Sequence, residues 1–536
     1  MKNKSGKFTY DTARLIIYGG LTGVICGAVL SLFLACAKIV TSFALDLYKH
    51  SQDAPIAVVC ILILSLLCCL LTAIVQQLCP SSKGSGIPLA EGSARGMLKV
   101  KWLSSAATLI VGSFLAFLSG LPLGSEGPSV GVGALIGEGV GKTAKKPIEF
   151  RRYLITGGAS AGLAAAFNAP LTGIVFAFEE AHRRFSPYIL LAVCSTVIPS
   201  VCVFQAVFFG LGQIPYLHSL GIHAGGAALA FLPQTEIAME HLPLFLCVAL
   251  ISGIVCALFG ALFNRAIPAF AKLLSRIKRT ELRLLPVFLL SAAVGIAAYS
   301  TVGTGEFTLE HNAAGTGLLI LSAILAARFV LTALASGSGA TGGLFLPMIA
   351  IGGLIGAITS RLCGLCGMTD AYSANIIMLC VCAFFAASVR APITAALLAV
   401  ELTGSFSNLL PCIVAVATAI AASEFLKTEP LYERMLEDLQ KAAPVPKGSL
   451  NMTVCGKVSE TSVVLGKRIR DVLWPYNSLV IGLERDGTAH VPDGETTLCE
   501  GDVLTVTAEN VQPDLFKEQI TDYIDIPDHL SSDDST

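Results

Sequence analysis

The sequence predicts an all-α polytopic membrane protein built from two homologous halves, with a small α+β domain at its C-terminal end. Composition gives the first indication: 54% of the 536 residues are hydrophobic and only 14% are charged, whereas an ordinary soluble protein has about 25% charged residues. The second indication is the recurrence of long apolar stretches, and the third is an internal repeat. Most of the protein surface is therefore expected to face lipid.

Charge and cysteine usage exclude several function classes. The net charge of −1 provides no basic field that could hold nucleic acid. The 17 cysteines are scattered through apolar runs, without the paired spacings of a zinc site or the loop positions of a disulfide framework. No spacing joins a nucleophile to a base. We therefore expect neither an enzyme nor a bound metal or cofactor.

The membrane topology follows from the apolar stretches and the basic residues. The first 14 residues are polar and lead to no cleavage site, so the first helix should remain as an anchor. Lys and Arg cluster in some connecting segments and are missing from others. This bias places the segments rich in Lys and Arg, and the N-terminus, in the cytoplasm. We expect a multi-pass protein of the cell (plasma) membrane with both termini cytoplasmic. The basic segments are 95–101, 142–152, 183–184 and 276–283, and those without Lys or Arg are 210–240 and 301–314. The apolar stretches long enough for helices are 15–45, 56–79, 103–123, 153–180, 188–212, 241–275, 284–300, 315–335, 344–363, 373–403 and 409–426.

An internal repeat divides the membrane region into two halves, about 13–212 and 241–426. The run AAAFNAPLTGIVFAFEE (164–180) matches AASVRAPITAALLAVEL (386–402) at an offset of 222 residues, and GSEGPSVGVGALIG (124–137) matches GLFLPMIAIGGLIG (343–356) at an offset of 219. Two-fold repeats that carry short, broken helices at corresponding positions are typical of secondary transporters, whose substrate site lies where the halves meet.

Three glycine motifs place helix N-termini at membrane depth. GSGIP (84–88), GSEGP (124–128) and GLFLP (343–347) each supply glycine and then a proline suited to the first turn of a helix. Such an end exposes free N–H groups and carries about half a positive charge, so converging ends would bind an anion. Glycine lets the ion approach the amides, and Ser85 adds a hydroxyl donor. The alternative is helix packing through glycine, common in membranes; three motifs, two of them repeat-related, favour the anion site.

Carboxylates at two places in the sequence stand out. Glu126, in GSEGP, is costly at membrane depth and is therefore expected to be functional. Ionised, it can occupy the site that positive helix ends prepare for an anion; protonated, it is free to leave, which couples proton uptake to anion movement. Glu179 and Glu180 end an apolar helix, and since adjacent helical residues point about 100° apart, one can face a pathway. We interpret Glu179 as structural. The alternatives are a solvent-exposed Glu126 and an ion pair of Glu180 with Arg183 or Arg184.

GSGIP, GSEGP, GLFLP and the downstream FEE (178–180) together resemble the signature motifs of the CLC chloride channel and transporter family, over about residues 10–440. The resemblance implies a homodimer, in which each subunit has its own anion pathway between two inverted repeats of broken, tilted helices (the CLC fold). It implies that Glu126 is the gating glutamate and Glu180 the internal proton-transfer glutamate that exchangers carry and typical channels lack. Ser125 departs from the pattern, because many members carry Arg or Lys there. The anion-binding residues that the resemblance implies are Ser85 and Tyr432 through their hydroxyls, Leu344 and Phe345 through their amides, and Gly127.

The C-terminal part has a soluble character. We expect a linker at 441–450, a domain at 451–512 and a partly disordered tail at 513–536. SLVIGLERDGTAHVP predicts a hairpin that turns at Asp486-Gly487, CEGDVLTVTA another strand, and LGKRIRDVL (465–473) a short amphipathic helix. The pattern resembles the TrkA-C (RCK-C) regulatory domain rather than paired CBS domains. Such domains dimerise, and some bind small ligands such as nucleotides. Because the transport motifs precede the linker, we expect a chain truncated after Ala443 to retain chloride flux.

Several interpretations of the function stay open. The first is a proton-coupled chloride antiporter, which Glu180 favours; the second is a passive voltage- or pH-gated chloride channel of the same fold. A fluoride exporter would be expected to carry Met in place of Ser85 and Asn in place of Ser125. A potassium pathway would need a carbonyl-lined loop such as TVGYG, which the sequence lacks. The expected partners are chloride, protons, lipid, a second copy and a small-molecule (nucleotide) ligand at the C-terminal domain, but no nucleic acid.

Overall fold

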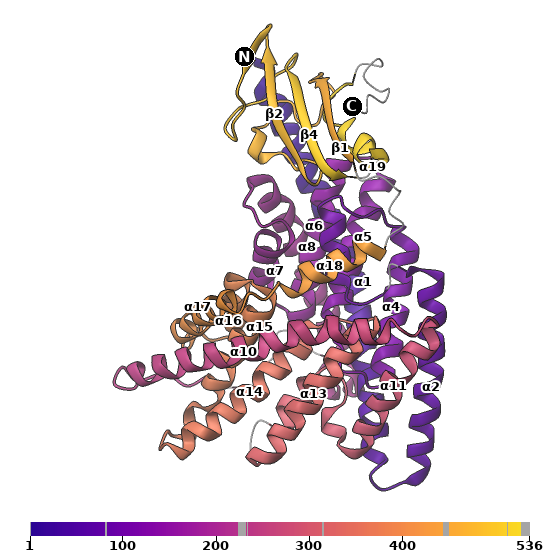
Figure 1. The fold of residues 1–536 in the computed structure, drawn as a ribbon, viewed down its shortest axis with the longest axis vertical. Coiled ribbons are helices and arrows are strands. Elements are labelled where there is room, and N and C mark those ends of the chain that lie inside the picture. Colours follow the sequence, from indigo (N-terminus) through magenta and orange to yellow (C-terminus); the bar gives the residue numbers. More distant parts are fainter. Residues whose placement is uncertain are drawn as a thin grey trace.

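The chain forms a helical membrane domain with a small sheet domain stacked on one end of it (Figure 1). The computed structural model describes residues 2–80, 83–222, 232, 234–312, 316–442, 450–511 and 513–526. Within these residues, eight helices are long and apolar enough to cross a membrane, and the polytopic all-α prediction for this part is confirmed.

Each half contributes long helices and short ones that end inside the domain. The first half contains α1 (Lys2–His50), α2 (Pro55–Leu78), α3 (Gly86–Ala94), α4 (Trp102–Leu118), α5 (Glu126–Thr143), α6 (Ile148–Phe167), α7 (Pro170–Phe176), the π-helical turn η2 (Ala177–Ala181), α8 (Pro187–Leu211) and α9 (Pro215–Ser219). The second contains α10 (Leu242–Leu274), α11 (Thr280–Ala297), η3 (Tyr299–Thr301), α12 (Glu306–Asn312), α13 (Leu318–Ser338), α14 (Phe345–Leu365), η4 (Asp370–Tyr372), α15 (Ser373–Val389), α16 (Pro392–Thr403) and α17 (Leu409–Phe425), followed by α18 (Leu431–Ala442).

Two of the predicted apolar stretches, 153–180 and 373–403, are each broken at equivalent places. α6 ends at Asn168, in the left-handed conformation with φ 53°, and α7 begins at Pro170. α15 ends at Arg390, with φ 70°, and α16 begins at Pro392. Proline disfavours helical backbone in the residue before it and lacks an N–H for a continued helix. The Ala-Pro step shared by both repeats therefore breaks both helices.

The two halves are inverted with respect to each other, and two pairs of repeat-related residues show the relation. Gly124 and Gly343 form an antiparallel bridge in which each N–H donates to the other residue's carbonyl at 2.7 Å. Two equivalent residues that exchange identical hydrogen bonds are related by a local two-fold rotation. The bridge fixes the start of α5 against the start of α14.

Glu179 and its repeat partner Glu401 cap helices reciprocally. The carboxylate of Glu179 accepts hydrogen bonds from the first amides of α16, at Ile393 (2.8 Å) and Thr394 (2.6 Å). The carboxylate of Glu401 accepts them from the first amides of α7, at 2.8 and 2.7 Å. Each carboxylate satisfies amides that a helix N-terminus leaves free. This geometry agrees with the structural interpretation of Glu179.

The C-terminal domain is a four-stranded antiparallel sheet in the order β1-β4-β2-β3 with one helix. The hairpin is present, and both turn residues, Asp486 (φ 51°) and Gly487 (φ 75°), have the left-handed backbone of a type I′ turn. The helix expected over 465–473 is wrong: only the 3₁₀ turn η5 (Ile469–Asp471) forms, because Val472 is extended and Leu473 is buried in the apolar core of the membrane domain. The elements are β1 (Leu450–Lys457), β2 (Ser478–Arg485), β3 (Thr488–His490), β4 (Val503–Val511) and α19 (Pro513–Ile520).

The domain extends beyond residue 512, where we expected it to end. α19 follows β4, and Tyr523 and Ile524 are fully buried in the core of the domain. The first part of the expected tail is therefore folded, whereas its last part, 527–536, and most of the expected linker, 443–449, lie outside the described residues.

One ion pair, between a buried carboxylate and a partly exposed arginine, supports the sheet. The Asp502 carboxylate, 1% exposed, accepts from Arg485 at 2.7 and 2.8 Å and from the Cys499 amide at 2.6 Å. Burial alone would raise the pKa of Asp502, but the Arg485 guanidinium and the Cys499 amide outweigh it, so the pKa lies below its usual value.

Candidate functional site

Three helix N-termini meet where the two halves join. α3 begins directly after Ser85, α5 begins at Glu126 and α14 begins at Phe345, so the predicted helix starts are confirmed. They meet because of glycine: a Cβ on Gly127 would lie 2.6 Å from Ser85 Oγ and 2.7 Å from Gly343 Cα. Converging N-termini direct free amides and positive partial charge toward one region of the pathway.

Two hydroxyls lie buried next to these helix ends. Ser85 is 3% exposed, and its Oγ accepts from the Ile87 amide at 3.4 Å, which leaves its hydrogen able to donate. Tyr432 is on α18, which contacts α3. Its hydroxyl is buried and meets no hydrogen-bond partner among the described residues. A buried hydroxyl without a partner is unfavourable, so this position suits a ligand that accepts hydrogen bonds.

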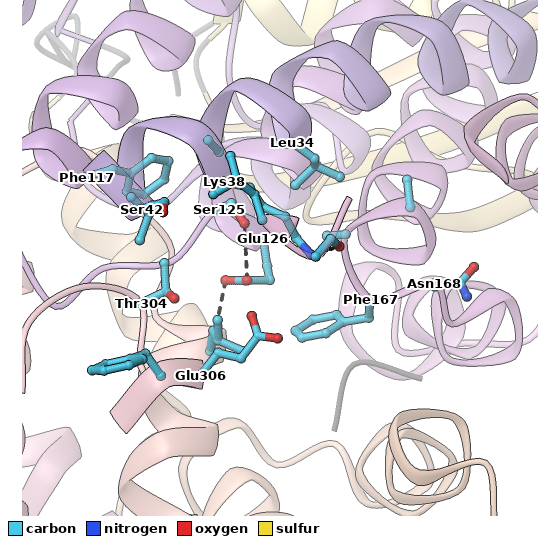
Figure 2. A pocket seen from close by; sticks show the side chains of 18 of the residues that line it. Leu34, Lys38, Ser42, Phe117, Ser125, Glu126, Phe167, Asn168, Thr304 and Glu306 are labelled. Carbon is cyan, nitrogen blue, oxygen red and sulfur yellow. Dashed lines mark hydrogen bonds between the residues drawn. The ribbon is translucent and has the colours of Figure 1, made fainter. Parts of the chain in front are cut away.

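Glu126 bends over the amino end of α14 (Figure 2). Its side chain is 2% exposed; Oε2 accepts from the Leu346 amide at 3.4 Å, and Oε1 accepts from Ser125 Oγ at 3.3 Å. The carboxylate therefore occupies the positive end of a helix, the place that favours an anion. A carboxylate on α5, in the first half, thus binds a helix of the second half.

Glu180 lies on η2, on the side of the helix ends toward the C-terminal domain. It is 2% exposed and lies near Glu91 on α3, also 2% exposed, whose charge opposes the ionisation of Glu180. Two buried carboxyl groups near each other favour a state in which one of them carries a proton. The ion pair with Arg183 or Arg184 considered from the sequence does not form among the described residues: Arg183 binds Glu433 at 2.9 Å, and Arg184 donates to a backbone carbonyl.

Glu91 is a site residue that sequence reasoning missed. It follows Ser85 by six positions on a nine-residue helix that is buried throughout. A carboxylate inside such an apolar element is a functional signal of its own, but its proximity to Glu180 is created by the fold. Arg95, at the end of the same helix, lies 4.0 Å from Glu91 and donates to the Glu180 carbonyl at 2.8 Å.

A cavity of 610 Å³ opens on the other side of Glu126. Lys38, Ser125, Glu126, Phe167 and Glu306 are among its lining residues (Figure 2). α6 separates it from the C-terminal domain: Ile148, at the start of α6, donates to Asp522 of that domain at 2.7 Å, whereas the last turn of α6 lines the cavity. A helix of 20 residues is about 30 Å long, so the cavity belongs to the opposite face.

The C-terminal domain is docked at the end of α3 and the start of α6. Arg152, 4% exposed, donates to the carbonyl oxygens of Leu473 (2.6 Å) and Trp474 (3.0 Å), and also to that of Ala94 at the end of α3 (2.8 Å). Lys467 and Glu149 form an ion pair at 2.7 Å that is almost fully buried. Arg152 therefore links the domain to the far end of α3, the helix that begins after Ser85.

The fold and the site define a class: a polytopic ion-transport protein with paired, inverted repeats whose broken helices present their amino ends to a buried carboxylate. The chain belongs to the CLC family, because residues 68–424 match the family model described as voltage gated chloride channel. Residues 457–520 match the TrkA-C domain. Both family resemblances inferred from the sequence are thereby confirmed.

Curated relatives and solved structures agree with this assignment. The chain is 31% identical over 433 residues to an H(+)/Cl(−) exchange transporter ClcA from Vibrio cholerae, covering 78% of this chain and 87% of the relative, and 31% identical over 436 residues to ClcA from Cronobacter sakazakii, covering 79% and 89%. A slow cyanobacterial Cl−/H+ antiporter superposes with a TM-score of 0.70 at 26% identity, over 80% of this chain and 99% of that one. A CLC-type fluoride/proton antiporter shares the fold, with a TM-score of 0.62 at 22% identity over 79% and 98%.

Proposed function

We propose that this protein is a proton-coupled chloride antiporter, in which chloride and the Glu126 carboxylate compete for the amino ends of α3, α5 and α14. The position of Glu126 at the start of α14, with Leu346 donating to it, is the observation that carries the proposal. An ionised carboxylate there excludes chloride, and a protonated one loses its attraction to the positive helix end. Each exchange of chloride for Glu126 thus takes up or releases a proton.

The anion is held by donors rather than by a full positive charge. Ser85 and Tyr432 donate hydroxyl hydrogens, and Gly127, Leu344 and Phe345 offer backbone amides at two helix starts. The unpartnered Tyr432 hydroxyl supports this donor set, because chloride would satisfy it. Neutral donors bind an anion with less desolvation than a buried lysine would need, so the ion can also leave.

Protons reach Glu126 from the inner face through Glu180. The proximity of Glu180 to Glu91, both buried, supports this role, since a pair of buried carboxyl groups of which one holds a proton can store and release that proton inside the protein. This favours an exchanger over a passive channel, which needs no internal proton store. Ser85 in place of the Met expected for a fluoride exporter favours chloride.

The remaining partners are also inferred. The protein works as a homodimer in the cell membrane, with both termini cytoplasmic; the apolar residues Ile393, Leu410 and Ile413 on α16 and α17 are about half exposed and supply a face for lipid or a second copy. The C-terminal domain binds a small-molecule ligand such as a nucleotide. The ClcA relatives are transporters, and chloride is substrate rather than cofactor.

Simultaneous measurement of chloride and proton fluxes in liposomes tests the exchange. The wild-type protein should use a chloride gradient to drive protons uphill. Glu126→Gln should move or bind chloride without proton coupling, and its gate should no longer respond to pH. Glu180→Gln should lose proton transport while chloride still moves and Glu126 still responds to acid on its own side.

Glu424→Gln is a matched control, because this carboxylate is 72% exposed and pairs with Arg390 at the surface; it should leave coupling unchanged. Chloride flux without uphill proton movement in the wild type would make the protein a channel. Intact coupling in Glu180→Gln would remove the relay role of that residue.

A further inference from the structure

The cavity outside Glu126 contains charges that the proposed transport scheme does not use. Lys38 on α1 and Glu306 and Glu310 on α12 line it together with Glu126. In Figure 2 Lys38 lies beside Ser125, and Glu306 lies on the other side of the Glu126 carboxylate. An anion that enters from this face passes between one cationic and two acidic side chains before it reaches the helix ends.

Lys38 is the cationic side chain of this cavity among the described residues that line it. Its ammonium group donates to the Gly221 carbonyl at 2.8 Å, which holds it at the cavity wall, and no carboxylate of the described chain lies within ion-pair distance. Position 125, next to Glu126, contributes a serine hydroxyl and no charge. The positive charge at this mouth therefore comes from Lys38.

Glu306 faces the same space. It is half-buried, at the start of α12, and its carboxylate makes no hydrogen bond or ion pair with another described residue. Its charge acts on Lys38 and on Glu126. The backbone that precedes Glu306 is held by Arg328 on α13. The Arg328 side chain is fully buried and donates to the carbonyl oxygens of Thr301 (2.9 Å) and Gly303 (2.6 Å).

The groups that act on Glu306 come from three helices. Lys38 on α1 favours its ionised form, whereas Glu310, one turn along α12, and Glu126 on α5 oppose it. Burial is the largest influence and raises the pKa of Glu306, which lies between two candidate spans. His311, on the same helix, stacks on the Phe307 ring instead.

We propose that Lys38 and Glu306 form an anion-entry site on the face opposite the C-terminal domain, in which Lys38 attracts chloride and Glu306 controls how much of that attraction is available. The proposal deepens the proposed function, since it names residues that serve chloride on its way to Glu126. With Glu306 ionised, its charge opposes that of Lys38. With Glu306 protonated, one of the negative charges that oppose Lys38 is removed, and chloride enters more readily.

The consequence is a second effect of acid on this face, separate from the gate. Protonation of Glu306 raises the local concentration of chloride, because a charged, partly enclosed cavity concentrates the opposite ion. Protonation of Glu126 opens the inner site. Acid on this side therefore acts on chloride twice, at entry and at the gate, whereas acid on the inner face acts through Glu180.

Chloride currents of the full-length protein in planar bilayers test this, in a Glu126→Gln background that removes the gate. The half-saturating chloride concentration is measured with chloride and pH changed on one side at a time. We expect Lys38→Met to raise it about fivefold on the side of the cavity only, a modest effect of one partly screened charge. Lys38→Arg should restore it. Glu306→Gln should lower it at neutral pH and remove its dependence on pH.

Glu424→Gln is the matched control, since this carboxylate is 72% exposed and is not among the residues that line the cavity, so water and salt screen its charge; it should change the constant less than twofold. An unchanged constant in Lys38→Met, or equal effects of the two glutamate variants, would overturn the proposal. ³⁶Cl exchange into liposomes gives the same constant if the background variant carries no current. Neither measurement needs proton coupling, so a protein that proves to be a channel can still possess this entry site, and an exchanger can lack it.

Discussion

Removal of one charge from the docking interface should loosen the C-terminal domain. Lys467 and Glu149 form an ion pair at 2.7 Å, with side chains 12% and 2% exposed. Glu149 also accepts from the Leu473 amide (3.4 Å) and the Tyr153 hydroxyl (3.3 Å). Lys467→Met keeps most of the lysine stem and removes the charge, so Glu149 stays buried with two hydrogen bonds and no cation.

The size of the effect follows from that geometry. Removal of one partner from a buried ion pair costs about 3–5 kcal/mol, because the other charge is left uncompensated. The two remaining hydrogen bonds place Glu149 at the lower end, about 3 kcal/mol. Since about 1.4 kcal/mol is a factor of ten in an equilibrium constant, the interface should open about 100-fold more often.

Hydrogen exchange followed by mass spectrometry measures this opening locally. Peptides that cover 147–153 on the membrane domain and 467–474 on the C-terminal domain should both exchange faster in Lys467→Met. Arg468→Met is the matched control, because its ion pair with Glu495 is about half exposed on both sides and such pairs contribute about 0–1 kcal/mol.

A second variant separates the ion pair from simple loss of packing. Replacement of both partners of a buried ion pair by apolar residues is often neutral, so Lys467→Met with Glu149→Met should exchange nearly as slowly as the wild type. Unchanged exchange in the single variant, or a double variant as open as the single one, would refute the argument that the charge of Glu149 needs Lys467.

Three further predictions concern the anion site, the repeat and the sheet. Ser85→Ala with Tyr432→Phe should weaken chloride binding by at least about 1 kcal/mol in calorimetric titration; unchanged affinity would reject these donors. Glu179→Ala and Glu401→Ala each remove a cap worth about 1–2 kcal/mol and should lower the melting temperature similarly, whereas a large difference would contradict reciprocal capping. The pKa of Asp502 is lower in the folded state than its value of about 3.9 in unfolded chains, so its stabilisation is present above about pH 4 and lost as the pH falls through the folded value; in Asp502→Asn, urea unfolding followed by limited proteolysis should lose this dependence, and a persistent one would assign it to another group.

Local signals explain what the sequence predicted correctly. The helix starts at Ser85, Glu126 and Phe345 follow from glycine and proline, whose backbone preferences act within a few residues. The hairpin turn at Asp486-Gly487 has the same origin. Because two of these helix starts also repeat along the chain, their meeting at one site could be expected from the sequence alone.

The errors arose where contacts between distant segments decide the structure. Glu91 and Glu180 are 89 positions apart, and no local pattern pairs them. Residues 465–473 have a helical pattern, but the chain is extended there, so that Leu473 enters the apolar core of the membrane domain and its carbonyl meets Arg152. Tertiary burial outweighs a propensity worth a few tenths of a kcal/mol per residue. The same contacts argue against a freely attached C-terminal domain: truncation before it would uncover Arg152 and Glu149.

The inverted repeat is itself part of the proposed mechanism. The bridge between Gly124 and Gly343 holds the starts of α5 and α14 against each other, so the carboxylate that follows one glycine reaches the amide that follows the other: Glu126 on the first half accepts from Leu346 on the second. One half alone could supply a positive helix end or a carboxylate. The first side chain of a helix cannot accept from the amino end of a second helix unless the other half supplies that helix. Competition between carboxylate and chloride therefore requires both halves, and a change that separates the two glycines should abolish gating and anion binding together.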